Sequence, residues 1–443
     1  YVITVNGEIY NFLELRAEFK KNGYVFHGRS DTEVALAAIE LYGFEGGLSR
    51  LVGMYAIGLW DRKDRVLYLA RDRLGEKPLY YGQIGNYFAF ASDLNALRQI
   101  PGWNNEIDRD ALGLLMQHFY VPAPRTIYQG IKKMLPGCWA KIDSQNFLTE
   151  TEITRYWSVS QLTQLENQVL NDVDKSQAVH RLDLLLRETI KSKLISDVPI
   201  GAFLSGGIDS STIVALMQAE SMSRVKTFSI GFTSADFDEA NEARKVAQHL
   251  GTDHTELYVG PEDAIKVIPD LPYIYSEPFA DSSQIPTYLV SSLARENVTV
   301  ALTGDGGDEL FGGYNRYMLL ESIWKILGVM PQPVRHRLGS GIQSLASSHV
   351  GRLLHALSQG VPRTWRHRRF SDKMWKLGAL CGSDSALAAY RTLISVWPRP
   401  SCLVEGAKDR DILQAMPDAI INSNNLRQKM MLVDMMTYLP DDI

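Results

Sequence analysis

Between residues 198 and 304 the sequence alternates short apolar runs with segments of helical spacing. The apolar runs are "VPIGAFL" (198–204), "VKTFSIGF" (225–232), "HTELYV" (254–259) and "VTVALTG" (298–304). One intervening segment, "EANEARKVAQHLG" (239–251), carries its apolar side chains on one stripe and ends on a glycine, as an amphipathic helix does, and another helix is expected from Ser210. Strand, helix and strand in repetition predict a doubly wound parallel sheet.

The rest of the chain divides into regions of different character. Short aromatic or β-branched runs predict strands in the first 157 residues: "YVITVNG" (1–7), "GMYAIGLWD" (53–61), "RVLYLARD" (65–72), "NYFAFASD" (86–93) and "CWAKID" (138–143). Between them, "DTEVALAAIELYG" has helical spacing and is expected to end at Gly43. We therefore expect an α/β and α+β chain with a first domain over 1–157, a polar linker over 158–178 and a second domain over 179–443, mostly helical after residue 318.

Composition limits the classes of partner. The 443 residues include 46 basic and 51 acidic side chains, a formal net charge of −5, which argues against binding to nucleic acid or to anionic membranes. The three cysteines, Cys138, Cys381 and Cys402, lie far apart without CxxC spacing, so we expect no disulfide framework or zinc site and a reducing, cytoplasmic setting. No apolar run reaches the roughly 18 residues of a membrane span. Small-molecule partners are expected.

The stretch "FLSGGIDSS" (203–211) lies where a predicted strand gives way to a helix. Backbone N–H groups and the positive end of the helix dipole face an anion at such a turn. Gly206 and Gly207 let the backbone approach a ligand closely. Further polar groups come from Ser205, Asp209, Ser210 and Ser211. The hydroxyls can donate to phosphate, and the Asp209 carboxylate can hold a magnesium ion that bridges phosphates.

Other phosphate-binding and nucleophile motifs do not fit this stretch. The sequence has no GxxxxGK[ST], so a P-loop lysine is missing, and the glycine spacing is not the GxGxxG of dinucleotide-binding folds. The nucleophile elbow of hydrolases requires GxSxG, but Phe203 stands in the position of the first glycine. The sequence therefore predicts a phosphate cradle of another kind.

"SGGIDSS" resembles the PP-loop of ATP pyrophosphatases, and together with "TGDGGDELFGGYNRY" (303–317) it resembles the synthetase domain of glutamine-dependent asparagine synthetases. The resemblance implies cleavage of ATP between its α and β phosphates, with a substrate carboxylate becoming an acyl-adenylate. It assigns magnesium to Asp209 and Asp308 and adenylate formation to Asp305, where some relatives have Glu. The ATP-binding positions it implies are Phe203, Leu204, Ser205, Gly206, Gly207, Asp209, Ser210, Ser211, Ile230, Thr303 and Gly304.

The first domain resembles the glutaminase domain of class II amidotransferases, an N-terminal-nucleophile fold of stacked sheets between helices. The resemblance rests on "NGEIYN" (6–11), "RSDTEVAL" (29–36), "GMYAIGLWD" (53–61) and "RDRLGEKPLYY" (71–81). It implies that the Asn6 side chain and the Gly7 N–H form an oxyanion hole, where loss of a donor costs about 10²–10³ in rate. It also implies that Glu8 and Asp31 bind the α-ammonium group of glutamine.

Two family features lie outside these residues. Tyr1 begins past the positions of the N-terminal cysteine nucleophile and of an arginine for the glutamine carboxylate, and "YLPDDI" (438–443) stops before a family lysine that reaches the phosphates. We therefore expect a sequence truncated at both ends. Residues 1–443 alone are expected to lack glutaminase activity and to have weak or no synthetase activity.

The resemblance implies a glutamine-hydrolysing asparagine synthetase that uses ATP, Mg²⁺, glutamine and aspartate, and a homodimer is compatible with it. Three alternatives remain open from the residues. One is amidation of another carboxylate, and a second is ring closure with an inactive first domain, against which the retained "NGE" and Asp31 weigh. The third is a non-catalytic regulatory paralogue that binds nucleotide.

Overall fold

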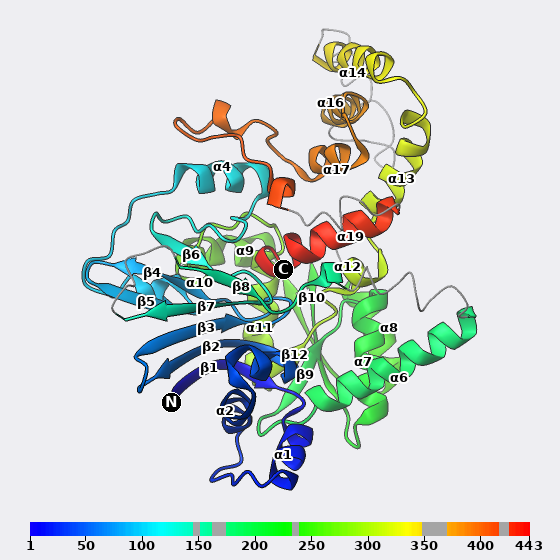
Figure 1. Ribbon diagram of the computed structural model, residues 1–443. Coiled ribbons are helices and arrows are strands. Elements are labelled where there is room, and N and C mark those ends of the chain that lie inside the picture. The colour runs from blue at the N-terminus through cyan, green and yellow to red at the C-terminus, as the bar shows by residue number, and fades with distance from the viewer. Residues whose placement is uncertain (145–150, 162–173, 233–238, 348–369, 416–424) are drawn as a thin grey trace.

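The computed structural model describes residues 1–144, 151–161, 174–232, 239–347, 370–415 and 425–443. Its first part contains two antiparallel sheets, and its second part contains a parallel sheet followed by helices (Figure 1). The expected α/β and α+β fold class is confirmed. No helix within the described ranges is both long and apolar enough to span a membrane.

The first part is built on two stacked sheets. The five-stranded sheet has the order β1 (Val2–Ile9), β2 (Gly53–Asp61), β3 (Val66–Arg71), β7 (Cys138–Asp143) and β8 (Ile153–Arg155). The three-stranded sheet has the order β5 (Tyr87–Ala91), β4 (Tyr80–Ile84) and β6 (Ile131–Lys133). Side chains such as Leu69, Tyr81 and Ala140 form a shared core between the sheets. All five expected strands are present, and β4, β6 and β8 were not expected.

Helices α1 (Phe12–Lys21) and α2 (Asp31–Arg50) cover the other face of the five-stranded sheet. Ser30 caps α2 by accepting a hydrogen bond from the Glu33 N–H. The expected end at Gly43 is wrong: Gly43 interrupts the helix with a φ of 75°, but helical structure continues to Arg50. The part of α2 after Gly43 stays helical because its side chains Phe44 and Leu48 are buried in the same core as the part before Gly43.

The second part contains the parallel sheet that the alternating pattern predicted. Its strand order is β11 (Asp253–Val259), β10 (Lys226–Phe232), β9 (Ile200–Phe203) and β12 (Val300–Leu302). Helices α6 (Lys175–Lys193), α7 (Ile208–Glu220) and α8 (Ala240–Leu250) pack on one face. Helix α11 (Gln284–Arg295) packs on the opposite face against Phe228. Helix α8 ends at Gly251 in the left-handed conformation, as the sequence predicted.

The remaining described elements are mostly helices. They are α3 (Leu94–Leu97), α4 (Arg109–His118), α9 (Pro261–Val267), η1 (Ile268–Asp270), α10 (Leu271–Ile274), α12 (Gly307–Phe311), α13 (Asn315–Leu327), α14 (Gln332–Ser347), α16 (Phe370–Cys381), α17 (Ala386–Ile394), η3 (Pro400–Cys402), η4 (Ile412–Ala415), α19 (Leu426–Met436) and α20 (Tyr438–Asp441). The buried Asp434 carboxylate joins α13, α17 and α19 by accepting hydrogen bonds of 2.6 Å each from Arg316, Tyr317 and Tyr390.

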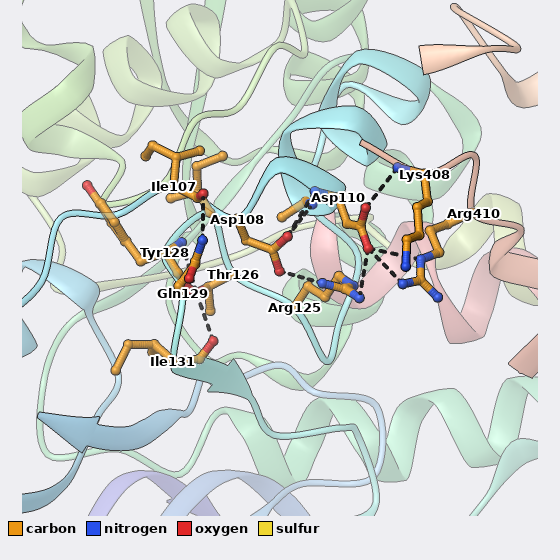
Figure 2. Close-up of polar contacts among 12 residues, drawn as sticks. Ile107, Asp108, Asp110, Arg125, Thr126, Tyr128, Gln129, Ile131, Lys408 and Arg410 are labelled. Atoms are coloured by element: carbon orange, nitrogen blue, oxygen red, sulfur yellow. Dashed lines mark hydrogen bonds and ion pairs between the residues drawn. The ribbon is translucent and has the colours of Figure 1, made fainter. Parts of the chain in front are cut away.

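One polar contact between the first part and the C-terminal helical part surrounds Asp110 on α4. Its carboxylate accepts hydrogen bonds from the Lys408 backbone N–H at 2.9 Å and from Arg410 Nη2 at 2.7 Å. Arg125 lies beside it, 3.4 Å from Asp110 and paired with Asp108, which also caps α4 (Figure 2). The contact thus connects α4 to residues 408–410.

Asp72 organises the loop after β3. Its carboxylate is buried and accepts hydrogen bonds from five backbone N–H groups: Tyr55, Leu74, Gly75, Glu76 and Lys77. These bonds, 2.7–3.2 Å long, fix the turn beside strand β2. A carboxylate can accept all five because it has acceptor sites only.

We predict that Asp72→Asn lowers the free energy of unfolding by about 2–4 kcal/mol, because an amide NH₂ group would face backbone donors and leave them unpaired. Urea unfolding measures the change. Asp61→Asn is the matched control: Asp61 also accepts two backbone N–H bonds, from Lys63 and Asp64, but in an exposed turn. We expect it to cost less than about 1 kcal/mol. Equal losses in the two variants would contradict the role of burial.

Candidate functional site

The "SGGIDSS" loop connects strand β9 to helix α7 at the carboxyl edge of the parallel sheet. The Leu204 N–H bonds to the Phe228 carbonyl at 2.9 Å, which extends the sheet to the start of the loop. Helix α7 begins at Ile208, two residues before the expected Ser210. Gly206 has a φ of 80°, and a Cβ there would lie 2.7 Å from the Ala243 nitrogen, so only glycine fits between the loop and α8.

Serine hydroxyls inside the loop fix its shape. Ser205 Oγ and Ser210 Oγ lie 2.9 Å apart, and the Ser205 and Gly207 N–H groups donate to these hydroxyls at 3.2 and 3.3 Å. Ser210 is buried, so its hydroxyl holds the loop, whereas Ser205 and Gly207 are exposed. The Ser211 hydroxyl is buried without a hydrogen-bond partner among the described residues.

The second motif meets this loop because β12 pairs with β9 in parallel. Gly304 and Gly307 lie directly against Asp209: a Cβ on Gly304 would be 3.1 Å from Asp209 Cβ, and a Cβ on Gly307 would be 2.7 Å from Asp209 Cγ. Any side chain at Gly307 would displace the carboxylate. The glycines of the "TGDGG" turn therefore let the two loops approach to van der Waals contact.

Asp209 and Asp308 interact through this contact. Burial, and then the negative charge of Asp308, raise the pKa of Asp209. Two carboxylates that repel each other at the edge of a sheet are stabilised by a cation between or beside them. Among the residues that the structure describes, no three His, Cys, Asp or Glu side chains form a metal-binding group. Magnesium still fits this donor set, because it commonly takes one or two carboxylates and completes its shell with water and substrate phosphates.

The other residues assigned to ATP surround the same edge. Phe203 ends β9 and is half-buried, Ile230 lies on the neighbouring β10, and Thr303 follows β12. The Asp305 N–H donates to the Thr303 hydroxyl at 3.3 Å, and Asp305 itself is exposed at the tip of the turn. Both motifs thus lie at the carboxyl ends of adjacent parallel strands.

The residues assigned to glutamine lie in the first part of the chain. Asn6, Gly7 and Glu8 are consecutive on β1, paired with Ala56, Tyr55 and Met54 on β2. A Cβ on Gly7 would lie 1.9 Å from the Met54 carbonyl oxygen, so the strand position excludes any side chain. The Asn6 side chain is on the exposed side of the strand.

Glu8 and Asp31 form a carboxylate pair. Asp31 begins α2, and its Oδ2 accepts a hydrogen bond from the Ile9 N–H at 2.9 Å, which holds the helix start beside β1. Burial, and then the charge of Asp31, raise the pKa of Glu8. Because like charges are held together here, the pair favours a cationic ligand such as an ammonium group.

Sequence reasoning missed Glu309, which follows Asp308 in the second motif. Its side chain is buried, and Oε1 accepts a hydrogen bond from the Tyr314 hydroxyl at 2.6 Å. Oε2 has no hydrogen-bond partner in the described part of the chain, and burial raises the pKa of this carboxyl. The signal was present in the letters "GDELFGGY", where a glutamate precedes two apolar residues on a short helix.

Two known protein families match the two parts of this chain. A family model described as asparagine synthase matches residues 181–443, and one described as glutamine amidotransferase domain matches residues 1–157.

Among curated relatives, "Asparagine synthetase [glutamine-hydrolyzing] 1" of Bacillus subtilis (strain 168) is 36% identical over 367 residues, covering 79% of this chain and 56% of the relative. A putative asparagine synthetase of Mycobacterium tuberculosis (strain ATCC 25618 / H37Rv) is 36% identical over 364 residues, 80% of this chain and 54% of the relative. A putative asparagine synthetase 2 of Methanocaldococcus jannaschii is 37% identical over 322 residues, 72% of this chain and 59% of the relative.

The chain thus spans little more than half the length of these relatives. The matched regions include both loops at the edge of the parallel sheet and the carboxylate pair beside β1. The chain belongs to the asparagine synthase family and carries a glutamine amidotransferase domain ahead of its synthase domain.

Proposed function

We propose that this chain carries the two half-sites of a glutamine-hydrolysing asparagine synthetase. In the second half-site, ATP and the side-chain carboxylate of aspartate react: the carboxylate oxygen attacks the α-phosphorus, and pyrophosphate leaves. Ammonia released from glutamine then attacks the acyl carbon, AMP leaves, and an amide forms. The approach of Gly304 and Gly307 to Asp209 is the observation that carries the proposal.

The loop residues have distinct roles in this proposal. The loop binds the departing pyrophosphate at the positive end of helix α7, where Ser205 and Gly207 are exposed. Asp209 and Asp308 would hold Mg²⁺, which would supply positive charge to neutralise the phosphates. Asp305 lies on the exposed tip of the same turn, where it acts in adenylate formation.

The first half-site binds glutamine. Glu8 and Asp31 bind its α-ammonium group, which their paired negative charge favours. The Asn6 side chain and the Gly7 N–H, at consecutive positions on β1, stabilise the oxyanion of the tetrahedral intermediate. The setting is cytoplasmic, and the partners are the small-molecule substrates.

The reaction itself is the first test. We predict that the natural chain containing residues 1–443, supplied with ATP, Mg²⁺ and ammonium, releases AMP and pyrophosphate only when aspartate is present in a panel of carboxylates. Coupled pyrophosphate release and chromatography of the nucleotides measure it. Formation of ADP would overturn the mechanism, and turnover with another carboxylate in place of aspartate would overturn the substrate. Binding of ATP without any turnover would favour a regulatory paralogue.

Replacement of the half-buried carboxylate of Asp209 tests the second half-site. We predict that Asp209→Asn weakens Mg²⁺-dependent ATP binding by at least about tenfold, because one anionic magnesium ligand is lost. Glutamine binding should not change. Isothermal titration calorimetry measures both affinities. Asp183→Asn, which removes an exposed carboxylate paired with Arg187, is the matched control and should bind ATP normally. A loss of glutamine binding in Asp209→Asn would show that the residue is misassigned.

The carboxylate pair predicts how glutamine binding depends on pH. Because the pKa of Glu8 is raised, Glu8 is protonated at a higher pH than an ordinary glutamate, and the pair loses negative charge. Glutamine affinity should therefore fall as the pH is lowered from neutral into the mildly acidic range, while the chain remains folded. In Glu8→Gln the affinity should be lower at neutral pH and its acid-side fall shallower. Identical pH profiles for the two proteins would contradict the assignment.

A further inference from the structure

The short helix α20 contacts parts of the chain far apart in sequence. The Tyr438 ring lies 6.2 Å from that of Tyr120 in the first domain and 6.1 Å from that of Tyr314 in the synthase domain. Leu439 lies beside Gly306, and the Pro440 carbonyl accepts a hydrogen bond from Arg71. Asp441 pairs with Lys133. Four consecutive residues therefore link the two domains.

Lys133 fastens α20 to the first domain. Its ammonium group is buried, 2.7 Å from Glu277 Oε2 and 3.8 Å from Asp441 Oδ1, and it donates to the Val121 carbonyl. Burial alone would lower the pKa of Lys133, but the two carboxylates raise it, so the ammonium stays charged. A buried cation between two carboxylates has little freedom to move, because loss of either contact leaves a charge unpaired.

Backbone donors complete the same cluster. The second oxygen of Asp441 accepts a hydrogen bond from the Ala123 N–H at 2.7 Å, and the second oxygen of Glu277 accepts one from the Ile127 N–H at 2.6 Å. Both carboxylates belong to the synthase domain, whereas all of their donors belong to the first domain. The position of α20 is therefore set from the first domain.

Arg71 connects α20 to the loop that Asp72 organises. Its buried guanidinium donates to the carbonyls of Gly75 at 2.7 Å and Lys77 at 2.9 Å, and also to the Pro440 carbonyl at 3.3 Å. The first domain thus holds α20 by a second contact, at Pro440, the residue before the Asp441 that Lys133 binds.

Helix α20 also lies beside the glycine turn of the synthase half-site. The Leu439 side chain lies next to Gly306, within 3.8 Å of where a Cβ would be. The next residue, Gly307, packs on the Asp209 carboxylate. A shift of α20 would therefore remove the support of the turn that holds Asp308 beside Asp209.

We propose that Lys133 is a positioning residue of the synthase half-site: by holding Asp441 it fixes α20, and α20 holds the 303–308 turn in the geometry that binds Mg²⁺ and ATP. The inference rests on the proposed function. It assigns a residue of the glutamine domain to the ATP site, although Lys133 touches neither substrate.

The Asp110–Arg410 contact distinguishes this role from general docking of the domains. It also joins the first domain to the C-terminal part, with a carboxylate and a guanidinium 2.7 Å apart (Figure 2). The residues joined at this contact, 108, 110, 125, 408 and 410, include none of those assigned to either half-site. Arg410→Gln is therefore the matched control.

The experiment measures the Mg²⁺ concentration that gives half-maximal ATP binding, by titration calorimetry, in the parent chain and its variants. Lys133→Met should raise this concentration at least about fivefold while glutamine affinity stays unchanged, a coupling of ordinary size. Lys133→Arg keeps the positive charge, so its half-maximal Mg²⁺ concentration should lie within about twofold of the parent value. Arg410→Gln should match the parent. Leu439→Ala, which buries no unpaired charge, should shift the Mg²⁺ dependence in the same direction.

Several outcomes overturn the proposal. An equal shift in Arg410→Gln would mean that domain docking in general sets the ATP site. If Lys133→Met folds, as near-ultraviolet circular dichroism would show, an unchanged Mg²⁺ dependence refutes the role of Lys133. If it does not fold, an unchanged dependence in Leu439→Ala refutes the role of α20. A parent chain that binds no ATP would instead overturn the proposed function, whereas the outcomes above leave that function intact.

Discussion

The contact between Asp209 and the glycines of the 303–308 turn is the constraint on which the rest of the structure depends. It exists because β9 and β12 are parallel neighbours, so the loops that follow them leave the sheet at one edge. Gly304 and Gly307 remove the side chains that would keep the loops apart. The result is a pair of repelling carboxylates, Asp209 and Asp308, whose arrangement favours a bound cation.

Charged groups are buried where the two domains meet. Lys133 lies between two carboxylates of the synthase domain, and Arg71 donates to carbonyls on both sides of the boundary. Removing one partner of such a buried group typically costs about 3–5 kcal/mol, so the domains are held in a defined relation rather than by apolar contact alone. The first domain is therefore joined to α20 of the synthase domain by buried charged groups.

Sequence patterns predicted the fold class and the order of elements around both motifs. These follow from local signals, namely alternating apolar runs and glycine at turns. The sequence did not reveal Asp72, Lys133 or Glu309. These side chains bind backbone groups or residues far away in sequence, as Lys133 binds Asp441. The periodicity of apolar residues gives no sign of such contacts. Likewise, the sequence predicted a helix end at Gly43, but the helix resumes after it because Phe44 and Leu48 are buried in the core. Burial of this kind is a tertiary effect that a local pattern does not show.

The most direct test of the central claim is a crystal structure of the chain with Mg²⁺ and an ATP analogue that cannot be cleaved between its α and β phosphates. The geometry predicts phosphates over the 205–211 loop and a magnesium ion bound by Asp209 and Asp308 at about 2.0–2.1 Å. A nucleotide bound elsewhere, or a metal that contacts neither carboxylate, would contradict the claim that the two loops form one ATP site.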